Sequence, residues 1–129
     1  MAHWHGISRR KSSGGRLKRP SSYRGKRRTE IASEKQFTMI GATSRKNYRK
    51  RAGSQTVRVL FDTVVNVADK KTGKVMQATL SSVSENAADP NFVRRNIMTK
   101  GAVVETDKGR VRITSRPGSH GVINGVLLE

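Results

Sequence analysis

The chain has 129 residues, enough for one domain of ordinary size, and its 27 Lys and Arg outnumber nine Asp and Glu for a net charge of +18. Only 33% of the residues are hydrophobic and cysteine is absent, which excludes a large core, disulfide bridges and thiolate metal sites. No run of about 20 apolar residues occurs, so no transmembrane helix is expected, and the N-terminus lacks the apolar block of a secretory signal. Such a charge attracts nucleic acid, an anionic membrane face or an acidic protein.

The positive charge is concentrated in the first half of the chain. Met1–Gly53 carries 16 Lys or Arg against two acids, a net charge of +14, whereas Ser54–Glu129 carries 11 against seven, a net charge of +4. Glycine and serine are interleaved with the basic residues of roughly the first 35 positions, and no helical or strand period survives there. We expect a flexible basic arm over residues 1–36 and an antiparallel β domain over residues 37–129.

The arm contains the most basic stretch of the chain. Ten of the twenty residues in Arg9–Arg28 are Lys or Arg and none is acidic. The stretch could be a solvated tail, but an arm bound along a nucleic-acid backbone is favoured, because phosphate contacts reward charge regardless of sequence. Ser12–Arg16 is not a nucleotide-binding loop, since no Gly-Lys-Ser/Thr follows it. Trp4 could pack in a core or stack on a base.

Strands and turns follow the arm. Two short strands are expected at residues 37–40 and 48–51, and Ser54–Phe61 alternates as a third strand. Thr63–Ala68 and Lys74–Val83 predict a hairpin, because Asp69–Lys74 between them is a turn signal in which Gly73 can adopt a positive φ.

A single helical turn is expected in Ala88–Asn96, with Asp89 as its N-cap and Pro90 at its first position. Its residues Phe92 and Val93 suit packing, whereas Arg94, Arg95 and Asn96 should face outward. The two arginines could contact RNA or pair with acids of the domain such as Glu85, and both interpretations stay open.

A second hairpin spans Ala102–Ser115 with its turn at residues 107–109, and its returning strand alternates so that Arg110, Arg112 and Arg116 form an outward basic row. These arginines too could contact RNA or pair with acids. Residues 116–121 predict a turn, and residues 122–129 a closing strand. Short strands without a sustained helix indicate an all-β fold, a small antiparallel barrel or strongly curved sheet.

Catalysis and metal binding find little support. The acids are few and scattered, and no Ser-His-Asp order or paired-carboxylate pattern is present. His3 could bind Cu²⁺ or Ni²⁺ beside a free amino terminus, an accident of position, and His120 stands alone in a glycine-rich turn. We expect no enzyme, no cofactor and no metal site.

Four segments in order resemble the archaeal and eukaryotic small-subunit ribosomal protein number eight of the "e" type, which differs from the universal protein of that number. They are WHGISRRKSSGGR near the start, TMIG at residues 38–41, NAADPNFVRRNIMTKGAVVET at residues 86–106, and SRPGSHGVINGVL at residues 115–127. The length is similar to that of the archaeal form. The sequence departs from the family at residues 29–34, where Thr-Glu-Ile-Ala replaces a Tyr-Glu-Leu-Gly-like segment and Ser-Glu replaces Gly-Arg.

The resemblance implies a non-catalytic constituent of the small ribosomal subunit in the cytoplasm, with a curved six-stranded antiparallel sheet or barrel and a long basic N-terminal loop. It implies small-subunit ribosomal RNA and neighbouring ribosomal proteins as partners, with no membrane, no small-molecule substrate and no homo-oligomer. An architectural DNA-binding protein and an RNA-processing enzyme are the competing interpretations. The expected RNA-binding residues are Trp4, Arg9, Arg10, Lys11, Ser13, Gly14, Gly15, Arg16, Lys18, Arg19, Tyr23, Arg24, Lys26, Arg27, Arg28, Arg45, Lys46, Arg49, Lys50, Arg51, Arg94, Arg95, Arg110, Arg112 and Arg116.

Overall fold

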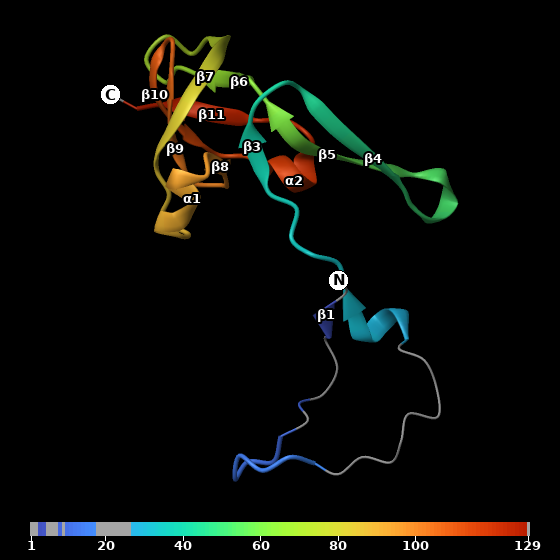
Figure 1. Ribbon diagram of the computed structural model, residues 1–129. Helices are drawn as coiled ribbons and strands as arrows, with labels where there is room; N and C mark the ends of the chain where they lie inside the picture. Colours follow the sequence, from blue (N-terminus) through green and yellow to red (C-terminus); the bar gives the residue numbers. More distant parts are fainter. Residues whose placement is uncertain (1–2, 5–7, 9, 18–26, 129) are drawn as a thin grey trace. The chain divides into compact units, whose positions relative to one another are not determined.

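The computed structural model describes residues 3–4, 8, 10–17 and 27–128, shown as the coloured ribbon of Figure 1. The chain divides into two compact units, an N-terminal unit of residues 1–35 and a β unit of residues 36–129. Each unit is described by itself below. In the described ranges no helix has the length and apolar character needed to cross a membrane.

The described elements are mostly short strands. In chain order they are β1 (His3–Trp4), η1 (Arg28–Glu30), β2 (Ile31–Ala32), β3 (Thr38–Ile40), β4 (Ser44–Arg49), η2 (Arg51–Gly53), β5 (Gln55–Asp62), β6 (Val64–Ala68), β7 (Val75–Glu85), α1 (Pro90–Arg94), β8 (Ile97–Met98), β9 (Val103–Thr106), β10 (Gly109–Ile113), α2 (Pro117–His120) and β11 (Asn124–Leu127). The predicted all-β class is therefore confirmed.

The N-terminal unit contains two paired strands that the sequence pattern did not reveal. Strand β1 pairs antiparallel with β2, with His3 opposite Ala32. Between them, Lys11 to Gly14 form a tight turn, in which the Gly14 N–H donates to the Lys11 carbonyl at 3.0 Å. Gly14 adopts a φ of +84° there, a conformation that glycine reaches without strain. These pairings lie within the N-terminal unit, and they do not establish the long basic arm expected from the sequence.

A closed barrel of five strands, in the order β10-β11-β6-β7-β9, forms the main body of the β unit. Four of its neighbouring pairs are antiparallel, and β6 and β11 are parallel. The expected all-antiparallel arrangement was wrong at this point, because strands cannot alternate in direction all the way around a closed ring of odd number. The expected count of six strands is not confirmed either.

Aliphatic side chains form the core of the β unit. The buried apolar cluster consists of Val59, Val65, Val67, Ala78, Leu80, Val83, Met98, Ala102, Val104, Val111, Ile113 and Ile123. The alternation predicted for the returning strand of the second hairpin is confirmed, with Val111 and Ile113 buried and Arg110 and Arg112 exposed. Alternation of this kind is the mark of a strand with one face on a core and the other in water.

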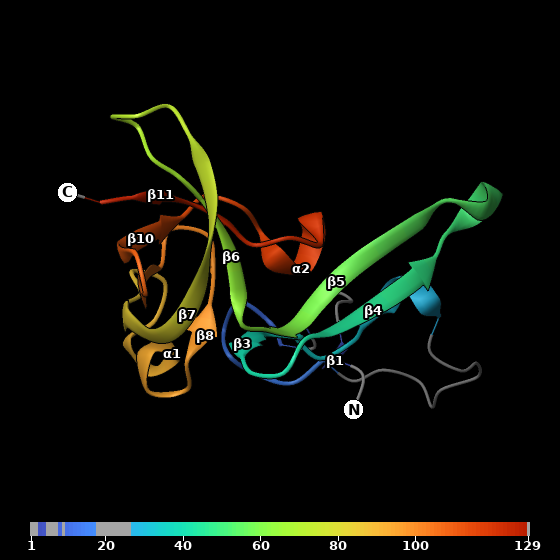
Figure 2. The same ribbon diagram turned by 90° about the horizontal axis from the view of Figure 1, so that it is seen from above.

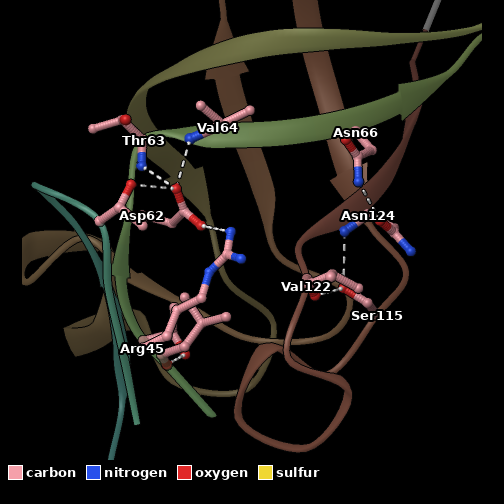
Figure 3. A network of polar contacts seen from close by, with 11 residues as sticks. Arg45, Asp62, Thr63, Val64, Asn66, Ser115, Val122 and Asn124 are labelled. Carbon is pink, nitrogen blue, oxygen red and sulfur yellow. Dashed lines mark hydrogen bonds and ion pairs between the residues drawn. The ribbon is translucent and has the colours of Figure 1, made fainter. Parts of the chain in front are cut away.

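Polar side chains secure the parallel pair that closes the barrel (Figure 3). The buried Ser115 hydroxyl donates to the Val122 carbonyl at 3.0 Å and accepts from the Asn124 N–H at 2.9 Å. The Asn66 amide of β6 then donates to the Asn124 side-chain oxygen of β11 at 3.0 Å. This network fixes the register of β11 against β6, since the two strands have no connecting turn to set it.

A four-stranded sheet, in the order β4-β5-β3-β8, adjoins the barrel within the β unit. Strands β3 and β5 are parallel, a second departure from the antiparallel expectation, while the other two pairs are antiparallel. Strand β5 runs through Thr63 directly into β6, so one chain segment passes from the sheet into the barrel. Figure 2 shows β4 and the first part of β5 extending away from the barrel as a two-stranded ribbon.

Both predicted hairpins are confirmed, as β6–β7 and as β9–β10. The predicted helical turn is confirmed as α1, with the Asp89 carboxylate accepting from the Asn91 N–H at 2.8 Å. Two local predictions were wrong. The strand expected at residues 48–51 is β4, which starts at Ser44 and ends at Arg49, and residues 117–120 form one helical turn, α2, inside the turn expected at residues 116–121.

Candidate nucleic-acid interface

Every predicted RNA-contact side chain or glycine whose burial is described lies exposed. These residues are Arg10, Lys11, Ser13, Gly14, Gly15, Arg16, Arg27, Arg28, Arg45, Lys46, Arg49, Lys50, Arg51, Arg94, Arg95, Arg110, Arg112 and Arg116. Six further candidates, Arg9, Lys18, Arg19, Tyr23, Arg24 and Lys26, lie outside the described residues, as does the side chain of Trp4. Exposure leaves the cations accessible to an anion, and some of them also form hydrogen bonds, ion pairs or cation–π contacts within the chain.

The turn of the N-terminal unit presents cations around exposed backbone. The Arg10 guanidinium donates to the Gly14 carbonyl at 2.9 Å, and Arg10 pairs with Arg16 as an isolated antiparallel bridge. Lys11 lies between them and donates its N–H to the Gly15 carbonyl at 2.8 Å. Three cations thus gather on a turn of seven residues, a density that nearby phosphate charge can neutralise.

The cationic ribbon, which we define as residues 44–58, is the densest cluster in the β unit. It contains β4, η2 and the first half of β5, and its six cations are Arg45, Lys46, Arg49, Lys50, Arg51 and Arg58. No acidic residue occurs in the sequence from Gln36 to Phe61. The ribbon's charge therefore has no local compensation along the chain.

Arg45 is the one ribbon cation with an acidic partner among the described residues. Its guanidinium lies 3.2 Å from the Asp62 carboxylate at the junction of β5 and β6, where Asp62 is 3% exposed (Figure 3). The same carboxylate accepts from the Thr63 and Val64 N–H groups at 2.9 and 3.2 Å and from the Thr43 hydroxyl at 3.1 Å. Arg45 thus supports the junction between sheet and barrel.

Asp62 remains ionised in this setting. Burial alone raises the pKa of its carboxyl, but the hydrogen bonds from two backbone N–H groups, Arg45 and Thr43 outweigh burial and hold the pKa below its ordinary value of 3.8. A charged carboxylate binds the N–H groups more strongly than a neutral one, which stabilises the sharp change of direction at Thr63.

Lys46 and Arg58 lie opposite each other on β4 and β5 and share the ring of Tyr48. The Lys46 Nζ is 5.4 Å and the Arg58 Cζ 5.0 Å from the ring centroid. The Tyr48 hydroxyl donates to the Gln36 side chain at 2.7 Å. Sequence reasoning named Lys46 but missed Arg58 and Tyr48, since Arg58 looked like the polar position of an alternating strand and only the register brings it to the cluster.

The helical turn α1 presents Arg94 and Arg95 beside a pair of aromatic rings. Phe92 packs against Phe37 with ring centroids 5.0 Å apart, as expected of a packing residue, and the Arg95 guanidinium lies 5.8 Å from the Phe37 ring. Neither arginine pairs with Glu85. The buried Asn86 at the start of this loop donates to the Ile97 carbonyl at 3.2 Å, anchoring it.

The three arginines of the predicted basic row, Arg110, Arg112 and Arg116, differ in whether they form ion pairs. Arg110 forms an ion pair with Glu85 of β7, so the expected partner of Glu85 was wrong in position, because the barrel brings β10 rather than α1 to that carboxylate. Arg112 and Arg116 form no ion pair within the described residues. The Arg116 backbone N–H donates a hydrogen bond to the His120 ring Nδ1 at 3.2 Å.

The described part of the chain is rich in exposed cations and poor in metal-ligating side chains. No group of three or more His, Cys, Asp or Glu side chains that could hold a metal ion occurs among them. What the exposed cations can do is bind an extended polyanion, through charge-assisted hydrogen bonds and counterion release. Arginine adds a planar fork suited to phosphate.

Comparisons with known proteins agree with the resemblance seen in the sequence. The profile of the family described as "Ribosomal protein S8e" matches residues 4–128. Relatives called "Small ribosomal subunit protein eS8" are 51% identical in Methanocorpusculum labreanum, 50% in Methanospirillum hungatei and 48% in Methanosphaerula palustris, each over 126 residues that cover 98% of both chains. These are names of ribosomal proteins and not of enzymes. The chain therefore belongs to the S8e family of ribosomal proteins.

Proposed function

We propose that this chain is a structural constituent of the small ribosomal subunit, in the cytoplasmic ribosome, that binds folded ribosomal RNA through its phosphates. Membership of the S8e family and the printed names of the archaeal relatives support the subunit assignment. The observation that carries the RNA-binding part is the exposure of the cations in both units together with the absence of acids from residues 36–61.

Residues 1–36 act in this proposal as a basic arm and residues 37–129 as a β domain. The arm and the β domain each contribute a net charge of +9, half of the total of +18, and both regions neutralise phosphates that otherwise repel one another in the packed RNA. Phosphate contacts position a protein without reading sequence, and A-form grooves hide base edges, so specificity comes from RNA shape. Neighbouring small-subunit proteins are its other partners, with no membrane, small-molecule substrate or second copy of the chain.

A salt titration tests the proposal. Full-length chain and transcribed small-subunit rRNA are mixed in filter-binding assays at several ionic strengths. A protein with about 6–10 phosphate contacts loses about 10³–10⁵-fold in affinity between about 50 and 200 mM salt, with a slope of about −0.9 per phosphate on duplex and about −0.7 on single strands. A steep response is expected, and a flat response would overturn the proposal.

Competition by duplex DNA separates this function from that of an architectural DNA-binding protein. Folded rRNA should resist displacement by a mass excess of DNA, because the proposed recognition depends on RNA shape and the 2′-hydroxyls. Equal competition by the two nucleic acids would instead favour the DNA-binding alternative.

A further inference from the structure

Two like charges face each other directly across the cationic ribbon. Lys46 of β4 and Arg58 of β5 are register partners, and directly opposed like charges destabilise a strand pair. Neither side chain has an acidic partner among the described residues, and Asp62, the acid nearest to the ribbon in sequence, is taken by Arg45. The free chain thus holds two adjacent positive charges whose repulsion would decrease if an anion bound between them.

The ring of Tyr48 holds these two cations together. Cross-strand partners share a face of the ribbon, and Tyr48 is two residues from Lys46 on that same face. Its ring lies 5.4 Å from the Lys46 ammonium and 5.0 Å from the Arg58 guanidinium carbon, within the range of cation–π attraction. The hydrogen bond from its hydroxyl to Gln36 fixes the ring in turn. The two cations are therefore ordered before any ligand binds.

We propose that Lys46 and Arg58 form a phosphate clamp for RNA, with Tyr48 as the positioning residue and with Arg45 paired to Asp62 rather than to a phosphate. The proposal rests on the RNA-binding function proposed above and assigns roles within it. It adds Arg58 and Tyr48 to the residues expected from the sequence and removes Arg45 from them.

The charge pattern of the ribbon selects the kind of anion. Beyond the clamp, Arg49, Lys50 and Arg51 continue toward the tip of the ribbon, where the chain turns in η2. A row of cations along an extended two-stranded element is complementary to a polymer with regularly spaced charges. The phosphodiester backbone of RNA is such a polymer, and its phosphates accept hydrogen bonds from both the planar guanidinium of arginine and the ammonium of lysine.

The test compares single charge removals by the salt dependence of rRNA binding in the full chain. Lys46→Gln and Arg58→Gln should each reduce the slope of log affinity against log salt by about 0.7–0.9, the contribution of one phosphate contact. Arg45→Gln and Lys108→Gln remove the same charge, but the first from Asp62 and the second from the β9–β10 turn beside Asp107. Both should leave the slope unchanged.

The role of Tyr48 is tested without changing any charge. Tyr48→Leu should weaken rRNA binding about fivefold, since it removes cation–π contacts worth about 1 kcal/mol together, while Tyr48→Phe keeps the ring and should stay within about twofold. A purely structural role would lower thermal stability in Tyr48→Leu and leave the affinity of the folded fraction unchanged. That result would remove Tyr48 from the clamp.

Failure of the clamp and failure of RNA binding give different results. A flat salt response of the unmodified chain overturns RNA binding itself. A steep response that persists with the same slope in Arg58→Gln and Lys46→Gln overturns the clamp alone, as does an equal loss of slope in Arg45→Gln. Displacement of rRNA by polyglutamate at equal charge, abolished by the same substitutions, would reassign the clamp to an acidic protein.

Discussion

Removal of the Asp62 carboxylate should destabilise the β unit far more than removal of its ion-pair partner. In Asp62→Ala, the Thr63 and Val64 N–H groups lose their side-chain acceptor at the bend between β5 and β6. A hydrogen bond to a charged group contributes about 1.5–3 kcal/mol, so two of them at the lower end of that range predict a loss of about 3 kcal/mol in the free energy of unfolding. The Thr43 hydroxyl and the Arg45 guanidinium can turn to water instead.

Arg45→Ala provides the contrast. Its side chain is 51% exposed, so its ion pair with Asp62 is screened by solvent and should contribute about 1 kcal/mol or less. For a domain of this size about 1 kcal/mol shifts the melting temperature by about 4–8 °C, so Asp62→Ala should lower it by about 12–24 °C. Thermal unfolding of the full chain followed by circular dichroism measures both. An equal or larger loss in Arg45→Ala would refute the assignment of Asp62 as a backbone acceptor.

Three further outcomes are expected from the same unfolding assays. Gly125→Ala should lower the free energy of unfolding by about 1–3 kcal/mol, because a Cβ there would lie 2.9 Å from the Arg112 carbonyl oxygen. Gly118→Ala, with open space around the added Cβ, should leave the free energy of unfolding nearly unchanged. Similar losses in the two variants would contradict the close approach of β10 and β11. Asp89→Ala should lower the free energy of unfolding by about 1 kcal/mol by removing the N-cap of α1, and an unchanged melting temperature would count against the cap. Because folding lowers the pKa of Asp62, the stabilisation by its carboxylate is complete above pH 3.8 and is lost as the pH falls through the pKa of the folded state. The difference in free energy of unfolding between the unmodified chain and Asp62→Asn should therefore become smaller in acid. A difference that does not change with pH would argue against an ionised carboxylate.

Signals within a few residues of one another were sufficient to predict the two hairpins and α1 from the sequence. The turn at Asp69 forms as expected because its carboxylate accepts from the Lys71 N–H at 2.8 Å and the Thr72 hydroxyl at 2.9 Å, contacts within three residues of each other. The cap at Asp89 likewise bonds to backbone two residues on. Interactions of this range can be predicted from sequence because chain connectivity alone brings the groups together.

Longer-range features could not be predicted in the same way. The parallel pair β6–β11 joins Asn66 to Asn124, and no turn chemistry marks a pairing between segments so far apart. Strand β4, with the sequence SRKNYR, has no apolar alternation, because it is stabilised by its ladder to β5 rather than by burial. Its start at Ser44 was therefore missed, although its end was placed within two residues.

The candidate interface was predicted as a set of cations but not in its internal organisation. The surface position of Arg110 and Arg112 followed from strand alternation. Which cations form ion pairs or cation–π contacts depends on the register between strands, which places Arg110 of β10 beside Glu85 of β7 and Arg58 of β5 opposite Lys46 of β4. Charge counts along the chain carry no such information.

The barrel's dependence on β11 has a consequence for the order of folding during synthesis. Strand β11 lies between β10 and β6, so the ring of strands stays open until residues 124–127 have been made. All of the basic first half leaves the ribosome that makes it well before this closure, and contacts between distant segments form slowly. The newly made chain thus passes through a stage in which its cations have been made and its barrel has not yet closed. A polyanion or chaperone that binds those cations during this stage would keep the chain from binding the wrong RNA.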